Sequence, residues 1–239
     1  MMDVLHKSLP HDMRVPRALP GVQPVTGSWL RWDEAFGGQM QRREEILRDH
    51  RHAVVYLEEN ARTAAAELLE EALAEAAWPR EGDRVQRPDG VWVTLDLSDP
   101  MGTLGRLFQS DFVIMDRPEG RDAHVLVAAV LCFPASWTLA EKAGRALADI
   151  HIPVEDYDDQ LARRVQRLFD GVQVGRPLWR FNALWYHDAE LFQPQRRTPP
   201  KGQETAYYRS ERQTILRLPR TRACVFVIHT YVLRAEDVL

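Results

Sequence analysis

The chain has few cysteines, no excess of positive charge and no long apolar run, and each shortage excludes a class of protein. Its two cysteines, Cys132 and Cys224, lie inside apolar segments, so we expect small core residues rather than a disulfide framework or a cysteine-bound metal. A formal net charge of −4 argues against general binding to nucleic acid or to a membrane surface. No apolar run approaches the roughly eighteen residues of a membrane span, and residues 1–13 contain no signal-peptide core. We therefore expect a cytoplasmic protein.

The length and composition predict one main domain with a helical segment before it. A chain of 239 residues that is 45% hydrophobic can bury one substantial core. Residues 1–28 are rich in proline and lack periodicity, which predicts an extended arm on the surface or on a partner. Two amphipathic helices, the second at about Asn60–Ala77, form the expected N-terminal helical layer at 29–79. Residues 80–239 are predicted to form the main domain.

The central and C-terminal segments are typical of an antiparallel sheet. After a short strand at Val91–Leu95, five apolar and β-branched segments are predicted to be strands, at Asp111–Asp116, His124–Phe133, Leu178–Tyr186, Ala206–Leu216 and Arg222–Leu233. Helices are expected between the second and third of them, including one at about Asp158–Asp170. Short links favour antiparallel pairing, so we expect an α+β fold in which helices cover one face of a five-stranded sheet. A cavity between sheet and helices is the natural ligand site.

The segment Trp137–Tyr157 carries the first candidate ligand, His151. Apolar residues recur at helical spacing in its first half, at Leu139, Ala143, Leu147 and Ile150. Pro153 is expected to end this helix just after His151. A histidine at the end of a packed helix is well placed to bind a metal. Most partly buried histidines are instead hydrogen-bonded structural residues, and the residues alone leave both interpretations open.

Two predicted strands carry polar groups among apolar ones. Alternation along Tyr208–Thr214 sends charges to both faces, with Arg209, Glu211 and Gln213 on one face and Arg212 and Thr214 on the other. This pattern indicates either a ligand site or an edge strand protected by charge. In Trp179–Trp185, Arg180 and Asn182 either bind a ligand or pack against aromatic rings.

Several short motifs occur in a fixed order along the chain. They are Trp137, Lys142 and Gly144, then Ile150-His151 and Pro153-Val154, then Glu211-Arg212-Gln213-Thr214, Arg217-Leu218-Pro219-Arg220-Thr221 and Phe226 with Thr230-Tyr231. Together with the block Gln109–Phe112, they resemble the haem-dependent oxidative N-demethylase α-subunit family, from about Trp29 to Tyr231. The resemblance implies a PAS-like fold that binds haem b. It also implies oxidation of a small secondary amine, such as dimethylamine, by dioxygen with release of formaldehyde.

The resemblance also implies roles for individual residues. His151 becomes the leading candidate for the proximal ligand of the haem iron, ahead of His124, His187 and His229. Arg212 would polarise dioxygen on the distal side, and Glu211 would hold the cationic amine. Cofactor-binding candidates for the haem and its propionates are Arg180, Asn182, Arg217 and Arg220. His229 stands where we expect the family to carry an arginine, so it joins Glu211 and Arg212 as a catalytic candidate and the distal pocket is expected to differ.

The chain contains no glycine-rich dinucleotide fingerprint and no cysteine set for an iron–sulfur cluster. Electrons are therefore expected from another polypeptide. The resemblance implies that this is a separate flavin and iron–sulfur reductase subunit, and that a folate-binding subunit takes the formaldehyde. The chain could also form a homodimer. Two alternatives to the enzyme stay open: a non-catalytic haem-based oxygen sensor or binding module, and a haem-free PAS-like interaction protein.

Overall fold

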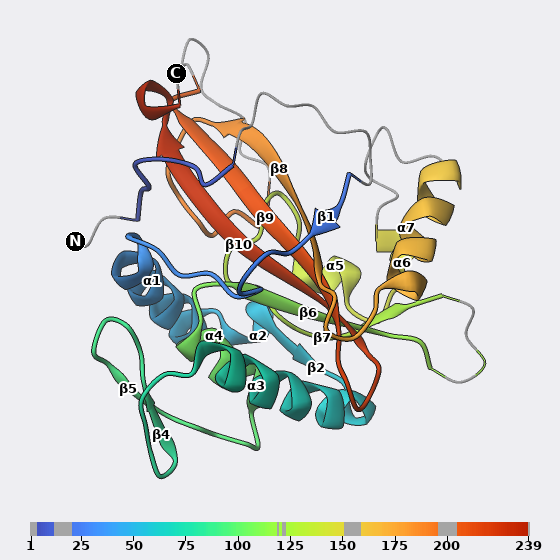
Figure 1. Ribbon diagram of the computed structural model, residues 1–239. Coiled ribbons are helices and arrows are strands. Elements are labelled where there is room, and N and C mark those ends of the chain that lie inside the picture. Colours follow the sequence, from blue (N-terminus) through green and yellow to red (C-terminus); the bar gives the residue numbers. More distant parts are fainter. Residues whose placement is uncertain are drawn as a thin grey trace.

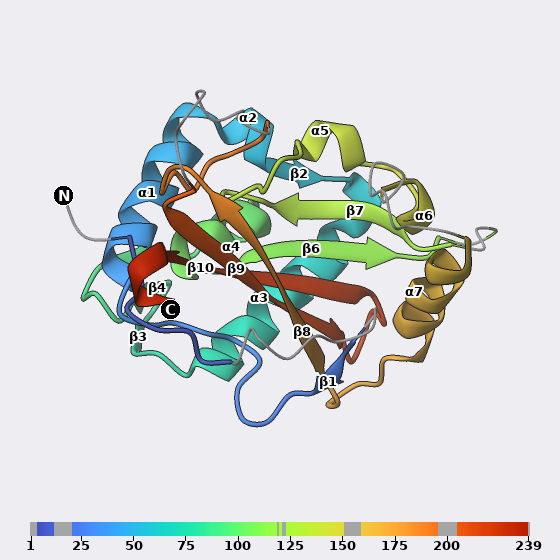
Figure 2. The same ribbon diagram turned by 90° about the horizontal axis from the view of Figure 1, so that it is seen from above.

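A large antiparallel sheet with helices on both faces forms the centre of the molecule (Figures 1 and 2). The computed structural model describes residues 4–11, 21–118, 120, 123–150, 159–195 and 205–238. The α+β class expected from the sequence is confirmed. Among the described residues, no helix combines the length and the apolar character that crossing a bilayer requires.

The large sheet has seven strands, rather than the five expected of a PAS-like sheet. Their order across the sheet is β1-β8-β9-β10-β6-β7-β2, and every neighbouring pair is antiparallel. The five expected strands are confirmed as β6 (Asp111–Asp116), β7 (Val125–Val130), β8 (Leu178–Tyr186), β9 (Tyr207–Arg217) and β10 (Cys224–Arg234). The two additional strands lie at the edges and are short, β1 (Gln23–Pro24) and β2 (Val55–Leu57).

A smaller, three-stranded sheet lies at the lower left of Figure 1. It consists of β3 (Arg80–Glu81), β4 (Arg84–Gln86) and β5 (Trp92–Thr94). Gly82 and Gly90 supply the left-handed backbone in its turns, with φ of 59° and 83°, a conformation that favours glycine. The short strand expected at Val91–Leu95 is thus present as β5, but it belongs to this separate sheet.

Helices cover both faces of the large sheet, which corrects the expectation of one covered face. On one side lie α1 (Phe36–Asp49), α2 (Arg51–Val54), α3 (Arg62–Ala76) and α4 (Pro100–Leu107). On the other side lie α5 (Leu139–Lys142), α6 (Leu147–Ile150) and α7 (Asp159–Gly171). Short 3-10 turns at Glu59–Ala61 and Ala235–Asp237 complete the elements of the described chain.

Local signals explain where several helices begin and end. Asp99 caps α4, since its side chain accepts a hydrogen bond from the Gly102 N–H at 3.0 Å. Thr138 and Glu141 form a reciprocal capping box at the start of α5. Helix α3 ends at Ala77, whose backbone is left-handed with φ of 49°, just before Pro79.

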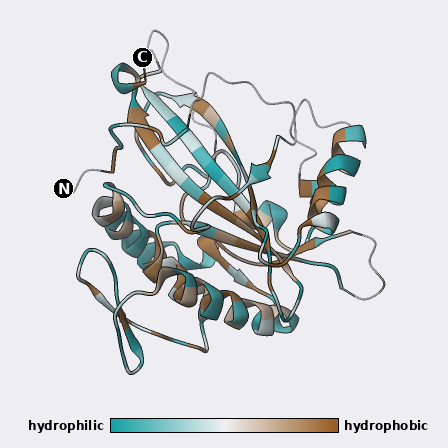
Figure 3. Ribbon diagram, viewed as in Figure 1, coloured by the Kyte–Doolittle hydropathy of each residue, from teal (hydrophilic) through white to brown (hydrophobic). Residues whose placement is uncertain are grey.

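Strand alternation divides the apolar residues between two cores. On β6, Phe112 and Ile114 pack into the core under α1, α3 and α4, whereas Val113 and Met115 face the core under α5–α7. Figure 3 shows hydrophobic residues concentrated where the sheet meets the helices, and hydrophilic residues along much of β9. The sheet therefore separates two environments, and each residue of a central strand faces only one of them.

The helix expected over Leu139–Ile150 is interrupted. Helices α5 and α6 have four residues each, and Gly144 between them has φ of 71°. Leu139 and Leu147 are nevertheless both buried against the sheet. The apolar spacing thus correctly predicted which residues face the core, but it did not reveal the break.

A buried ion pair joins α1 to the sheet. The Arg43 Nη1 lies 2.7 Å from the Asp111 Oδ1, and both side chains are almost fully buried. Asp111 also accepts hydrogen bonds from the backbone N–H groups of Cys132 and Phe133, at 2.8 and 2.9 Å. Arg43 donates through Nε to the Gly105 carbonyl at 3.0 Å. These bonds connect α1, α4 and the ends of β6 and β7.

Arg43→Met should lower the free energy of unfolding by about 3–5 kcal/mol, because the Asp111 carboxylate would remain buried without its counter-charge. Urea denaturation followed by circular dichroism measures the change. Arg48→Met is the matched control, because Arg48 pairs with Asp49 on the surface of the same helix and exposed pairs contribute little. Equal destabilisation by both variants would contradict the role given to the buried pair.

Candidate functional site

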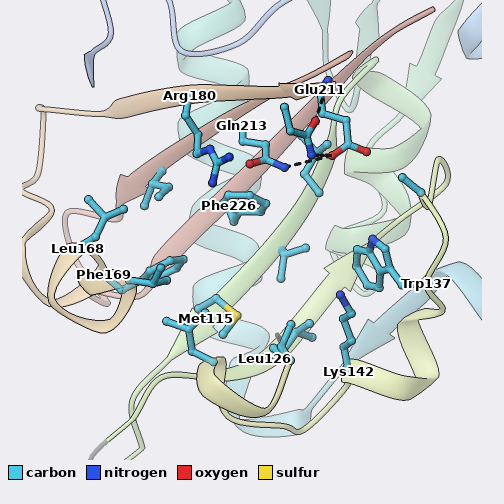
Figure 4. A pocket seen from close by; sticks show the side chains of 18 of the residues that line it. Met115, Leu126, Trp137, Lys142, Leu168, Phe169, Arg180, Glu211, Gln213 and Phe226 are labelled. Atoms are coloured by element: carbon cyan, nitrogen blue, oxygen red, sulfur yellow. Dashed lines mark hydrogen bonds between the residues drawn. The ribbon is translucent and has the colours of Figure 1, made fainter. Parts of the chain in front are cut away.

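A cavity of about 360 Å³ lies between the sheet and helices α5–α7 (Figure 4). Its volume falls within the range of about 300–1,000 Å³ that ligand pockets usually have. Most of its wall is apolar and comes from Val113, Met115, Leu126, Ala135, Trp137, Leu147, Ile150, Leu161, Val165, Leu168, Phe169, Leu184, Ile215, Phe226 and Ile228. The polar side chains in the wall are Lys142, Arg180, Asn182, Glu211 and Gln213.

Strand register brings most of these polar groups together. Glu211 and Gln213 are two residues apart on β9 and therefore point to the same face. Glu211 lies opposite Asn182 on β8, and Gln213 lies opposite Arg180. The polar part of the cavity is thus built by neighbouring positions on two long strands, which hold the side chains on a rigid support.

Glu211 is the centre of this polar group. Its Oε2 accepts hydrogen bonds from the Asn182 Nδ2 and the Gln213 Nε2, each at 3.1 Å. The Arg209 Nη2 lies 3.5 Å from the Oε1 of Glu211. The carboxylate is buried, with 7% of the residue exposed. It is therefore a fixed negative charge in an apolar cavity, a suitable counter-charge for a small cation.

Two cations line the same cavity. The Lys142 Nζ lies 4.0 Å from the centroid of the Trp137 ring, and burial lowers the pKa of Lys142 to about 8, although Glu141 and Glu211 partly offset this effect. Burial also lowers the pKa of Arg180, again against the attraction of Glu211. Among the described residues, neither cation forms an ion pair with a carboxylate. Both are available to an anionic group in the cavity.

Arg212 and His229 lie on the opposite face of the sheet. The Arg212 guanidinium lies 4.8 Å from the Trp179 ring centroid and donates to the Thr214 Oγ1 at 3.1 Å. The His229 Nε2 lies 2.8 Å from the Asp33 Oδ2. The two faces predicted for the strand Tyr208–Thr214 are confirmed. Only Glu211 of the three expected catalytic residues lines the cavity.

The expected propionate partners are also separated. Arg180 and Asn182 line the cavity. Arg217 instead donates to the carbonyl oxygens of Phe169 and Val172 at the end of α7, at 2.5 and 2.7 Å. Arg220 pairs with Glu70 on α3. The roles given to Arg217 and Arg220 stay predictions.

The first candidate ligand, His151, lies outside the described residues. Ile150, which directly precedes it, is buried and lines the cavity. Of the other histidines considered as iron ligands, His124 contacts Gln166 at 3.0 Å and His187 lies 3.3 Å from Asp188. Neither lines the cavity.

The sequence interpretation did not identify Lys142 as a site residue. Lys142 appeared only as one member of the family motif, and no periodicity places its side chain against the sheet. The pairing of Trp137 with Lys142 across the first turn of α5 was the available signal, since lysine often packs on an aromatic ring.

A comparison with protein families gives one match. The family model described as haem-dependent oxidative N-demethylase, alpha subunit-like, matches residues 21–239. The chain belongs to this family. The resemblance inferred from the ordered motifs is thereby confirmed, and the match covers the whole of the cavity described above. The family's description names haem as the group on which the demethylase depends.

The described cavity fits a haem in its chemistry. An apolar wall suits the porphyrin, and two buried cations without a described anionic partner suit its propionates. Ile150 places the chain at the cavity wall one residue before His151. The alpha-subunit part of the family name implies a multi-subunit assembly.

The depressed pKa of Lys142 gives a test of the cavity's electrostatics. Above pH 8 the amine should be mostly neutral, so its rate of acylation should rise with pH and reach half its maximum near pH 8. Glu211→Gln should move this midpoint to lower pH, because the charge of Glu211 helps to hold the proton on Lys142. Mass spectrometry of labelled peptides measures both profiles, with the exposed Lys7 as internal comparison. Identical profiles for Lys142 and Lys7 would contradict burial of the amine.

Proposed function

We propose that the chain is the haem-binding subunit of an oxidative N-demethylase and that the cavity between the sheet and α5–α7 holds haem b. The observation that carries the proposal is an apolar cavity whose wall holds one fixed carboxylate and two cations that have no ion-pair partner among the described residues, in a chain of this family. When bound, the haem supplies the activation of dioxygen and the oxidation of the amine, chemistry that side chains do not provide.

The residues of the chain would bind and orient the reactants. His151 would hold the haem iron, and Arg180 would pair with a propionate, with Lys142 as a second cation in the cavity wall. Glu211 would bind the ammonium of a small secondary amine such as dimethylamine. Asn182 and Gln213 hold the Glu211 carboxylate in place through hydrogen bonds. The apolar wall would exclude water around the reacting amine. Formaldehyde would be the released product.

The remaining partners follow from what the chain lacks. It has no flavin or dinucleotide fingerprint and no cysteine set for an iron–sulfur cluster. We therefore propose that another polypeptide donates the electrons. From the family resemblance we propose that it is a flavin and iron–sulfur reductase and that a folate-binding subunit accepts the formaldehyde, within a cytoplasmic complex.

A haem-based oxygen sensor or binding module is the second candidate. The observation that favours it is the position of Arg212 and His229, which point away from the cavity. Without them, no described arginine or histidine other than Arg180 lines the cavity. Release of formaldehyde from dimethylamine in the presence of a reductant and dioxygen distinguishes the enzyme from the sensor.

The first test concerns the axial ligand. Protein expressed with added haem should show a Soret band, and His151→Ala should lose or strongly shift it while the far-ultraviolet circular dichroism is unchanged, because the imidazole supplies a coordinate bond to iron. His52→Ala is the matched control, since His52 is exposed on α2. A wild-type chain without a Soret band would overturn haem binding, and an unchanged band in His151→Ala would overturn the ligand assignment.

The second test concerns Glu211. Glu211→Gln keeps the shape of the side chain but removes its charge. A hydrogen bond to a charged group contributes about 1.5–3 kcal/mol. The affinity for dimethylamine should therefore fall about 10- to 100-fold. Titration of the amine followed by the haem spectrum measures the dissociation constant. Arg212→Gln is the matched control on the adjacent residue, whose side chain faces the other way, and it should leave amine affinity unchanged. Weaker amine binding in Arg212→Gln alone would remove Glu211 from the proposed site.

A further inference from the structure

A second cluster of ligand-forming side chains lies on the face of the sheet away from the cavity. It consists of His6 from the N-terminal arm, Asp33 from the segment before α1, and His229 from β10. The Asp33 Oδ2 lies 3.0 Å from the His6 Nε2 and 2.8 Å from the His229 Nε2. The three ligand atoms all lie within 4.8 Å of one another. Residues from three distant parts of the chain thus converge on one point.

The two distances from Asp33 to the imidazoles are slightly shorter than those between the ligands of a zinc ion. Tetrahedral bonds of about 2.0–2.2 Å from zinc to nitrogen and oxygen place neighbouring ligand atoms about 3.3–3.6 Å apart. The observed separations of 3.0 and 2.8 Å would need only a small expansion to accept an ion. Two imidazoles and one carboxylate are a donor set that suits divalent zinc, iron and related ions.

The outer contacts of both imidazoles also suit metal binding. The Nδ1 of His229 lies 3.3 Å from the Ser110 Oγ. The Nδ1 of His6 accepts a hydrogen bond from the Val232 backbone N–H at 3.2 Å and lies 3.4 Å from the Val232 carbonyl oxygen. In the absence of an ion, the Nε2–H groups of both rings donate to Asp33. When an ion replaces these Nε2 protons, the Ser110 Oγ and the Val232 carbonyl oxygen can each accept an Nδ1 proton. Metal-bound histidines characteristically donate their other ring proton to such a partner.

Burial and charge support the same arrangement. His6 and His229 are each 2% exposed. The Asp33 carboxylate lies between the two rings and supplies a negative charge within reach of both Nε2 atoms. Asp33 keeps some exposure, with 15% of its side chain accessible, which gives an ion a path of entry.

We propose that His6, Asp33 and His229 form a binding site for one divalent transition-metal ion of the zinc type. The ion would bond to the Nε2 atoms of both histidines and to the Oδ2 of Asp33, with a water molecule completing its coordination. It would fix the N-terminal arm to β10. This site is independent of the proposed haem site, because it lies on the other face of the sheet and His6 precedes the residues matched by the family model.

Zinc titration of the metal-free chain, prepared without a histidine tag, tests the proposal. Isothermal titration calorimetry with ZnCl₂ should give one equivalent bound per chain. His6→Ala removes a ligand from the arm rather than from the sheet, so the circular dichroism of the chain should be unchanged. The zinc affinity should fall at least about 100-fold. This loss is larger than the 10- to 100-fold that follows from removing a partner of a ligand. His52→Ala, an exposed histidine, should bind zinc like the wild type.

Ser110→Ala separates a metal site from a purely hydrogen-bonded cluster. Loss of the Ser110 contact to His229 should weaken zinc binding about 10- to 100-fold while the ligands remain. Zinc binding absent in the wild type, or equal in the wild type and His6→Ala, would overturn the proposal. The Soret band of the haem-loaded His6→Ala chain should equal that of the wild type, so a failure of this site is distinguishable from a failure of haem binding.

Discussion

The buried pair of Arg43 and Asp111 sets the geometry on which both candidate sites depend. Burying two charges is expensive, and it is tolerated only where further hydrogen bonds satisfy the remaining polar atoms. Asp111 meets this condition through the backbone N–H groups of Cys132 and Phe133. Arg43 meets it in part, because its Nε donates to the Gly105 carbonyl while its Nη2 has no hydrogen-bond partner among the described residues. The pair therefore fixes the start of β6 relative to the end of β7 and to α1. Because Asp111 is also the register partner of Ile228, β10 is aligned by the same constraint.

Register in turn decides which side chains share an environment. A shift of one residue in β9 or β10 would exchange the faces of every side chain on that strand. In the observed register, Glu211 lies in the apolar cavity beside Asn182, whereas Arg212 lies opposite His229 on the other face. The sheet thus keeps a carboxylate suited to a cation apart from an imidazole cluster suited to a metal. Two kinds of polar chemistry can coexist in one chain because the sheet is closed by helices on both sides.

The sequence was most informative where local pattern and final structure agree. The five long strands were predictable because β-branched or aromatic residues run through them, and the opposite faces of Glu211 and Arg212 follow from alternation alone. The short strands β1 and β2 were not predictable, since two or three residues pair only because the large sheet presents an edge. Arg43 could have been found, because it continues the buried stripe of Met40 and Leu47 on α1. Its neighbours on that stripe are apolar, so a charged side chain at this position was expected to extend to the surface rather than to be buried.

The site was less predictable than the fold because its charged residues lie in segments whose sequences share no repeating pattern. Glu211 belongs to a strand and Lys142 to a four-residue helix, and their charges act on each other in the cavity. They form no ion pair with each other among the described contacts, although burial of both would favour one. Glu211 has the Arg209 Nη2 at 3.5 Å, whereas Lys142 has no ion-pair partner among the described residues. A half-buried cation on an apolar wall is stabilised when a ligand supplies an anionic group. A haem would bring anionic propionates to Lys142 and Arg180, and a small amine would bring a positive charge to Glu211. The two ligands together would therefore complement all three charged side chains.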